Sequence, residues 1–334
     1  MNEDLNLDCL LWDLAKSAFS CDKSSSLSLK MLASPYVQAT SLCIFLSILC
    51  FTVSSITGNY SQVDKLWSIT PVLYAWIPVF ASLSTHPRSI LMATLATIWG
   101  SRLTFNFYRR GGYKWPPWQG DEDYRWEHIR KGKYLPILSR KLPWVIFNLT
   151  FISFYQHFLL LLIVMPSFIV YTVSNHVNCI DIYTKQNQLN VMDFIAATLM
   201  LLFIIVEGVA DNQQYQFQTE KYRRIKSNQP LSGEFADGFK QSGLFAIVRK
   251  PNYAAEQLIW LCFYLFSVAA TGSAFNWSFT GAFLLVVLFQ GSGRFTENLT
   301  CMKYNKYNAY QKKVPLYIPR IRANQYDLSS KKSI

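Results

Sequence analysis

The residues best suited to chemistry stand at the start of an apolar stretch that follows Pro251. A helix that begins at this proline places Asn252, Glu256 and Trp260 at i, i+4 and i+8, so an amide, a carboxylate and an indole share one helix face. A carboxylate inside an apolar segment is costly unless it is paired or used. We therefore predict that this face lines a polar, functional interior.

A second polar stripe emerges from the apolar run that begins at Val191. Glu207, Asp211, Gln214 and Gln218 recur at i, i+4, i+7 and i+11, which places all four on one face of a helix. A helix that simply leaves a membrane accounts for the two glutamines, but not for Glu207, which lies well inside the run. The stripe predicts one polar groove.

A third polar group, Gln62 and Asp64, precedes the apolar run that begins at Leu66. Two interpretations are open for Asp64. The residue caps the N-terminus of the following helix, since Asp just before an apolar run is a good cap, or its carboxyl group contacts an oxygen atom of a substrate.

Cations also enter an apolar run. Arg102, Asn106 and Arg109 share a helix face at i, i+4 and i+7, and a buried guanidinium needs an anion or several acceptors. Arg102 either pairs with a buried carboxylate or binds the phosphates of a cofactor. Arg109 either binds those phosphates or belongs to a basic flank that meets lipid phosphates. We interpret Arg110 as part of a basic flank that meets lipid phosphates.

The composition indicates that a membrane positions these residues. Of the 334 residues, 51% are hydrophobic and 16% aromatic, which is more apolar than an ordinary soluble domain. Runs long enough to span a bilayer cover residues 35–56, 66–84, 89–108, 142–173, 191–210, 254–271 and 278–290. The fourth run exceeds one span, so we expect Pro166 to kink or split it. The predicted fold is all-α, a polytopic transmembrane bundle with about seven membrane helices.

The distribution of charge explains the net charge of +12 without a nucleic acid partner. Lys and Arg gather in alternate loops, within residues 109–141, 221–250 and 294–332, while the other loops hold few. This is the positive-inside pattern, and it predicts a cytosolic C-terminus with the N-terminus on the opposite side.

The ends of the chain suggest its membrane. We divide the chain into an N-terminal segment 1–34, a transmembrane domain 35–320 and a cytosolic tail 321–334. The first segment lacks the basic start of a cleavable signal peptide. Lys331 and Lys332 stand at the fourth and third positions from the C-terminal end, and resemble the dilysine retrieval address of multi-pass proteins of the endoplasmic reticulum membrane.

Other sites are not indicated. The seven cysteines and four histidines are scattered, so we expect neither a metal site nor a disulfide framework. The sequence also lacks a G-x-G-x-x-G fingerprint, a P-loop and a serine elbow, so a nucleotide would have to be held by helix ends and loops.

The stretch from Ser242 to Trp260 resembles the C-terminal signature of the steroid 5-alpha-reductase-like membrane enzymes, which reads roughly R-H-P-N-Y-x-G-E with a later tryptophan. The matching residues are Arg249, Pro251, Asn252, Tyr253, Glu256 and Trp260. Lys250 replaces the His of the family and Ala255 replaces its Gly. The passage from residue 62 to residue 126 looks like a little-characterised branch of the superfamily. The signature also occurs, in looser form, in sterol C14 reductases and in isoprenylcysteine and phospholipid methyltransferases.

The resemblance implies an NADPH-dependent reductase of a carbon–carbon double bond conjugated to a carbonyl group in a sterol or other lipid. It assigns cofactor binding to the C-terminal half, about residues 191–320, through Glu207, Asp211, Arg249, Asn252, Tyr253, Glu256 and Arg294. It makes Asp64, beside Gln62, the group that polarises the substrate carbonyl. Two alternatives stay open: an S-adenosylmethionine-dependent methyltransferase of a lipid or prenylcysteine, and a non-catalytic lipid-binding membrane protein.

Overall fold

The computed structural model describes residues 34–82, 86–132, 135–176 and 188–320, and this part of the chain is helical, with no strand. The proposed dilysine end and nearly all of the N-terminal segment lie outside the described residues. The elements run in the order α3 (Pro35–Thr57), α4 (Gln62–Leu66), α5 (Thr70–Ala81), α6 (Pro87–Arg109), α7 (Tyr124–Arg130), η1 (Pro136–Ser139), α8 (Lys141–Phe147), η2 (Asn148–Tyr155), α9 (Gln156–Leu162), α10 (Met165–His176), α12 (Val191–Lys226), α13 (Glu234–Asp237), η3 (Gly243–Ala246), α14 (Pro251–Thr271), α15 (Phe279–Lys303) and α16 (Tyr307–Lys313).

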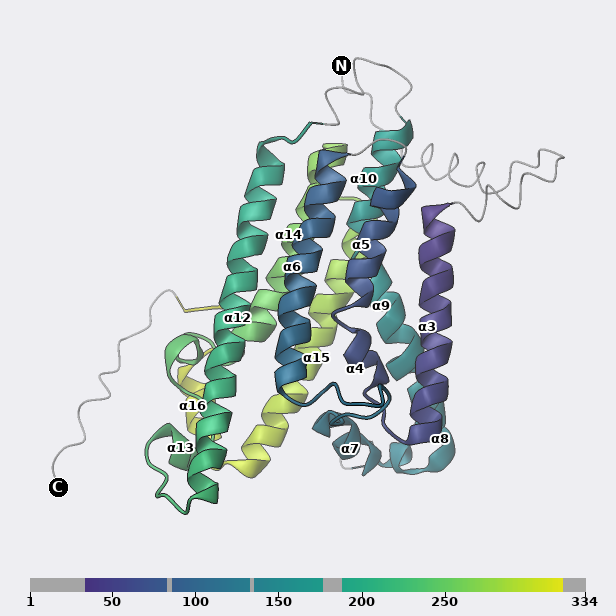
Figure 1. The fold of residues 1–334 in the computed structure, drawn as a ribbon. Helices are drawn as coiled ribbons and strands as arrows, with labels where there is room; N and C mark the ends of the chain where they lie inside the picture. The colour runs from purple at the N-terminus through teal and green to yellow at the C-terminus, as the bar shows by residue number, and fades with distance from the viewer. Residues whose placement is uncertain (1–33, 83–85, 133–134, 177–187, 321–334) are drawn as a thin grey trace.

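The long helices form one bundle around α14 (Figure 1). Helix α14 packs against α10, α12 and α15, and α5 packs against α6. The core between them is aromatic: Trp99 of α6 and Trp260 and Phe263 of α14 are fully buried. The two indole rings meet edge to face, with centroids 4.9 Å apart, a geometry that aromatic pairs favour.

The described helices confirm the prediction of an all-helical membrane bundle. Four segments are long and apolar enough to cross a membrane: α3, the run Lys141–Ser174, α12 and α14. Large apolar side chains on α3, including Phe45 and Ile48, are exposed, as lipid-facing side chains are. The other three predicted spans coincide with α5, which has 12 residues, and with α6 and α15, so the number seven stays a prediction.

The fourth apolar run is interrupted, as the position of Pro166 predicted. Helix α9 ends at Leu162 and α10 begins at Met165, because a proline nitrogen cannot donate the hydrogen bond that would continue the helix. Helix α15 approaches the chain closely here: a Cβ atom on Gly281 would lie 2.2 Å from the carbonyl oxygen of Leu162. A residue larger than glycine would push α15 away from α9.

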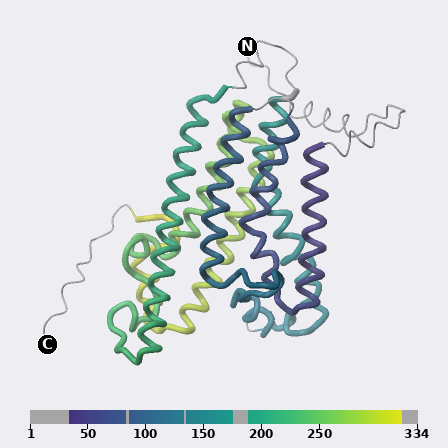
Figure 2. Tube along the Cα trace, in the orientation of Figure 1, coloured from purple at the N-terminus to yellow at the C-terminus, as the bar shows by residue number. Residues whose placement is uncertain are grey.

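One end of the bundle carries short helices, and we call it the cap end. Helices α7, α8, α13 and α16 gather there, at the bottom of Figure 1. Figure 2 shows that α12 runs the length of the bundle and reaches this end. Helix α7 begins where the sequence favours it, because the side chain of Asp123 caps its N-terminus by accepting a hydrogen bond of 2.8 Å from the backbone N–H of Arg125.

Candidate functional site

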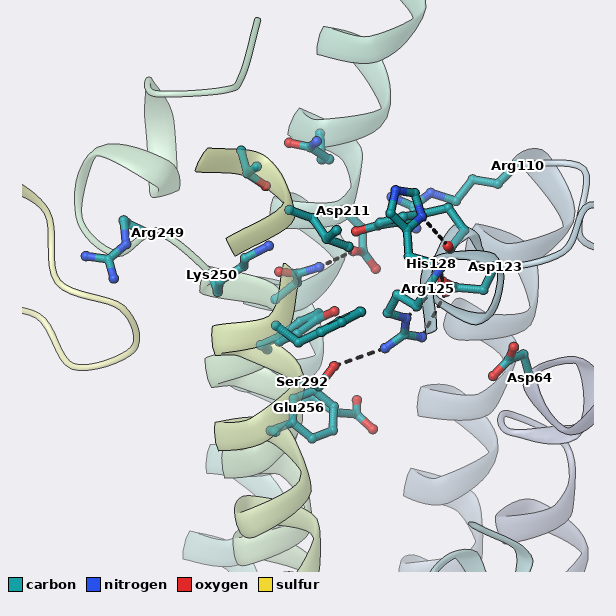
Figure 3. A pocket seen from close by; sticks show the side chains of 18 of the residues that line it. Asp64, Arg110, Asp123, Arg125, His128, Asp211, Arg249, Lys250, Glu256 and Ser292 are labelled. Carbon is teal, nitrogen blue, oxygen red and sulfur yellow. Dashed lines mark hydrogen bonds and ion pairs between the residues drawn. The ribbon is translucent and has the colours of Figure 1, made fainter. Parts of the chain in front are cut away.

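A cavity of about 1380 Å³ opens between the helices toward the cap end. One wall comes from α12, α14 and α15, and the opposite wall from α4, α6 and α7. Figure 3 shows the two walls, with Glu256, Lys250 and Ser292 on one side and Asp64 and Asp123 on the other. Asp64 of α4 and the polar residues predicted on α12 and near the start of α14, far apart in the sequence, therefore meet around one space.

The polar stripe of α12 forms part of the first wall. Glu207, Asp211, Gln214 and Gln218 all border the cavity, which confirms that the stripe lines one polar groove. Arg102 of α6 reaches both carboxylates, with its Nη2 atom 2.7 Å from Glu207 and its Nη1 atom 2.7 Å from Asp211. Of the two interpretations of Arg102, pairing with buried carboxylates is therefore the one observed.

Helix α14 supplies the next polar groups of this wall. The helix begins at Pro251, as predicted. The side-chain amide of Asn252 donates to Asp211 over 3.3 Å. Glu256 accepts hydrogen bonds from two indoles, that of Trp260 at 3.0 Å and that of Trp99 at 2.8 Å. The contact with Trp260 follows the predicted helix face, whereas the contact with Trp99 links α14 to α6.

The first wall is rich in hydrogen-bond acceptors. Glu207, Asp211 and Glu256 are between 3% and 5% exposed, and one guanidinium, that of Arg102, pairs with two of them. Three carboxyl groups beside one cation leave an excess of negative charge in a poorly hydrated place, unless a carboxyl group keeps its proton. Such a wall favours a ligand that donates hydrogen bonds.

Asp64 borders the cavity from the opposite wall, and its carboxyl group points into the space that Glu256 faces (Figure 3). The interpretation of Asp64 as a helix cap is wrong, because Ser61 occupies the N-cap of α4 and Asp64 lies in the first turn. Its carboxylate accepts a hydrogen bond of 3.0 Å from the indole N–H of Trp126. Burial raises the pKa of Asp64, and the negative charge of Asp123 raises it further.

Gln62, predicted beside Asp64, has a different place. Its side chain does not border the cavity. The amide nitrogen donates to the carbonyl oxygens of Asn59 and Trp118, over 3.1 and 3.0 Å, and the amide oxygen accepts from Lys65 at 3.1 Å. Gln62 thus holds the loop between α6 and α7 against α4, and this position favours a structural role over contact with a substrate.

Cations stand at the cap end of the cavity. Arg110, Arg125 and Lys250 border it. The guanidinium of Arg125 forms two hydrogen bonds of 2.9 Å with the Asp123 carboxylate and a third, of 3.0 Å, with Ser292 on α15. Burial acts to raise the pKa of Asp123, but the adjacent guanidinium outweighs it and lowers the pKa. From the sequence we interpret the mixed-charge loop that contains Asp123, Arg125 and Trp126 as a cytosolic cap on the bundle, and Asp123 and Arg125 are not among the predicted site residues.

Two predicted cofactor contacts lie elsewhere. Arg249 touches the edge of the cavity, but its guanidinium points away from it (Figure 3) and pairs with Glu297 at 2.5 and 2.8 Å. The same guanidinium donates to the backbone carbonyl oxygens of Gln311, at 3.0 Å, and Val314. Arg294 is exposed and does not border the cavity. These contacts favour a structural role for Arg249 and place Arg294 outside the site.

The remaining candidates divide between the cavity and the exterior. Tyr253 borders the cavity and packs edge to face against Phe289, with ring centroids 4.9 Å apart. Arg109 does not border it: its guanidinium binds the Asn106 side chain and lies 4.4 Å from the centroid of the Tyr215 ring. Within the part of the chain that the structure describes, no group of His, Cys, Asp and Glu side chains is arranged to hold a metal ion.

Sequence comparison identifies proteins that are similar to this chain. A family model described as "Protein of unknown function (DUF1295)" matches residues 50–314 of the chain, a range that includes every side chain of both walls. The chain is 34% identical over 303 residues to the uncharacterized protein C594.04c of Schizosaccharomyces pombe, and the match covers 88% of this chain and 82% of that protein. No solved structure matches the chain.

Proposed function

Because the chain belongs to the DUF1295 family, whose description leaves its function open, we propose its function from the geometry of the cavity and from the resemblance to steroid 5-alpha-reductase-like enzymes. The protein is an NADPH-dependent reductase of a carbon–carbon double bond conjugated to a carbonyl group in a sterol or other lipid. It works in the endoplasmic reticulum membrane with its C-terminus in the cytosol, a placement that the positive-inside pattern and the dilysine-like end support.

The observation that carries the proposal is the position of Asp64. Its carboxyl group faces the acceptor-rich wall of Glu256 and Asp211 across one cavity. A reductase of a conjugated double bond needs a hydride donor on one side of the substrate and a proton or hydrogen-bond donor at the carbonyl oxygen. The raised pKa of Asp64 favours its protonated form, which is the donating one.

The residues present fit a nicotinamide dinucleotide. Glu256 and Asp211 are suited to accept hydrogen bonds from a carboxamide N–H and from ribose hydroxyls, and Asn252 can donate to an amide oxygen. Arg125, Arg110 and Lys250, at the cap end, supply the cations that a pyrophosphate requires. The cavity, about 1380 Å³, exceeds the usual range of about 300–1,000 Å³ for a pocket that holds one small ligand, so it has room for a cofactor and a substrate.

The chain's own residues would supply the rest of the chemistry. NADPH held by these residues would supply a hydride for the β carbon of the substrate. The electron pair of the double bond then moves toward the carbonyl oxygen, where the Asp64 carboxyl group donates a hydrogen bond and stabilises the negative charge. One proton added at the α carbon balances the reduction. Trp126 holds the Asp64 side chain in place through its indole N–H.

The test is ligand-induced thermal stabilisation of the purified full-length protein in detergent. A ligand that binds only the folded state stabilises it by about 2.7 kcal/mol at a concentration one hundred times its Kd, so the assay needs no substrate. We expect NADPH to raise Tm for the wild type and for Arg294→Ala, whose side chain lies outside the cavity. We expect the shift to be lost in Asn252→Ala and in Arg125→Ala. A shift with S-adenosylmethionine instead of NADPH contradicts the proposal.

A further inference from the structure

A π-helix within the fourth apolar run borders the cavity. Element η2 is a π-helix of eight residues, Asn148–Tyr155, and π-helical turns are rare and frequent at functional sites. Phe151 and Tyr155 of η2 line the cavity. The rings of Phe147, Phe151 and Tyr155 stack in sequence, with centroids 5.0 and 5.3 Å apart. An aromatic ladder therefore forms one edge of the cavity within the fourth apolar run.

The apolar part of α15 forms the facing edge. Val287, Leu288 and Phe289 line the cavity, and Val287 is 50% exposed. A side chain that borders the cavity and is half exposed in the apolar part of a helix stands where the cavity wall is open. Gly281 holds α15 tightly against Leu162 one to two turns farther from the cap end. Val287 lies beyond that contact, on the side toward the cap end.

The cap end of the cavity and its apolar edges differ in charge. Arg110, Arg125 and Lys250 stand at the cap end. By contrast, residues 148–155 and 279–290 contain no charged residue. A charged nucleotide cannot cross an apolar, membrane-embedded edge without losing its hydration, while an apolar molecule gains nothing from a rim of cations.

We propose that the gap between η2 and the apolar part of α15 is a lateral portal through which a sterol-like lipid enters the cavity from the bilayer. Its apolar body lies against Phe151, Tyr155 and Val287, and its polar end points toward Asp64. The inference rests on the proposed function for the reaction that the lipid undergoes. The entry route does not depend on the proposed function, because the portal is defined only by the exposure and charge of its side chains.

The experiment uses the full-length protein reconstituted in liposomes that contain a photoactivatable sterol with a diazirine group. After illumination, mass spectrometry measures the labelling of cavity-lining peptides. Val287→Trp should narrow the portal and lower the rate of labelling about tenfold, equivalent to about 1.4 kcal/mol in the barrier to access. The matched control is Phe283→Trp, one turn away on the same helix, at a residue that is 52% exposed and does not line the cavity. This control should label like the wild type.

A second variant works in the opposite direction. Phe151→Ala removes a ring of the ladder and should raise the labelling rate, so the proposal stays testable if Val287→Trp lowers Tm and fails to fold. Wild-type labelling in Val287→Trp with an unchanged Tm, or no increase in Phe151→Ala, overturns the portal. If NADPH does not stabilise the wild type but both variants change labelling as expected, the portal stands and the proposed reductase function fails.

Discussion

The Nη1 atom of Arg125 donates a hydrogen bond of 3.0 Å to the hydroxyl oxygen of Ser292, and this contact joins α7 to α15 across the cap end of the cavity. The partners are 167 residues apart in the sequence. Arg125 is otherwise bound to Asp123 of its own loop. Release of Ser292 would therefore free the cap helix from the opposite wall while the charge of Arg125 stays compensated.

Loss of the Ser292 hydroxyl should loosen the cap. A hydrogen bond from a charged donor contributes about 1.5–3 kcal/mol, so Ser292→Ala should increase hydrogen–deuterium exchange in α7 and leave the exchange of α14 unchanged. Ser273→Ala, at an exposed loop position just after the C-terminal end of α14, is the control. Equal protection of α7 in wild type and Ser292→Ala would show that this contact does not hold the cap.

Removal of the Glu256 carboxylate should destabilise the core. Glu256→Ala leaves the indole N–H groups of Trp99 and Trp260 buried without their acceptor, at a cost of about 1–3 kcal/mol for each. Glu256→Gln keeps one acceptor oxygen and should lose roughly half as much. Thermal unfolding in detergent measures both variants. If Glu256→Ala unfolds at the wild-type temperature, the two indoles find other partners and Glu256 is free for a ligand alone.

Arg102 should contribute more to stability than Arg109 of the same helix. Arg102→Met leaves Glu207 and Asp211 buried without a counter-charge, and breaking a buried ion pair in this way costs about 3–5 kcal/mol. The double variant Arg102→Met/Glu207→Gln removes one of the stranded charges and should recover part of the loss. Arg109→Met, on the same helix but outside the cavity, should cost less than Arg102→Met. A double variant no more stable than Arg102→Met would contradict the electrostatic account.

The pKa of Asp64 should make stability depend on pH. Its folded-state pKa lies above the ordinary value of 3.8, so below that value Asp64 is protonated in both the folded and unfolded states. As the pH rises from 3.8 through the folded pKa, the unfolded state ionises first and stability is lost. Tm measured against pH should therefore fall for the wild type relative to Asp64→Asn across this window.

Substitution of Trp126 tests the predicted direction of the change in stability with pH. The indole N–H of Trp126 donates to the Asp64 carboxylate and so stabilises the charged form. Trp126→Phe should raise the pKa of Asp64 further and extend the loss of stability to higher pH. If Trp126→Phe shifts the window to lower pH, the hydrogen bond does not act on the carboxylate as the geometry indicates.

Periodicity in the sequence was enough to predict the two polar helix faces of the first wall. The four-residue spacing from Glu207 to Asp211 and from Asn252 to Glu256 fixes a helix face, and the positions of Pro166 and Pro251 fix an interruption and a start, as the structure shows. Periodicity does not indicate which side chains of other helices contact each face. Trp99 binds Glu256 from 157 residues away, and nothing local in the sequence indicates that pair.

The anion that each arginine binds could not be predicted from the sequence either. A guanidinium near a polar signature fits a cofactor phosphate and a buried carboxylate equally well, because both are anions with similar geometry. Only the packing of α15 and α16, which brings Glu297 and the carbonyl oxygen of Gln311 to Arg249, separates the two possibilities. For Arg102 the carboxylates of α12 decide in the same way.

The role of Arg249 can be tested apart from cofactor binding. Arg249→Ala strands the Glu297 carboxylate, which is 5% exposed, and removes the side-chain hydrogen bonds to the carbonyl oxygens of Gln311 and Val314. We expect a loss of about 3–5 kcal/mol in stability, with the protein that remains folded still stabilised by NADPH. Glu297→Gln should destabilise in the same direction, since Arg249 then loses its charged partner.

Arg294→Ala is the matched control, because its exposed side chain does not border the cavity and a surface substitution of this kind changes stability by less than about 0.5 kcal/mol. Thermal unfolding with and without NADPH separates the two effects for each variant. Normal stability of Arg249→Ala combined with lost NADPH stabilisation would return Arg249 to the cofactor site, where the resemblance to reductases first placed it.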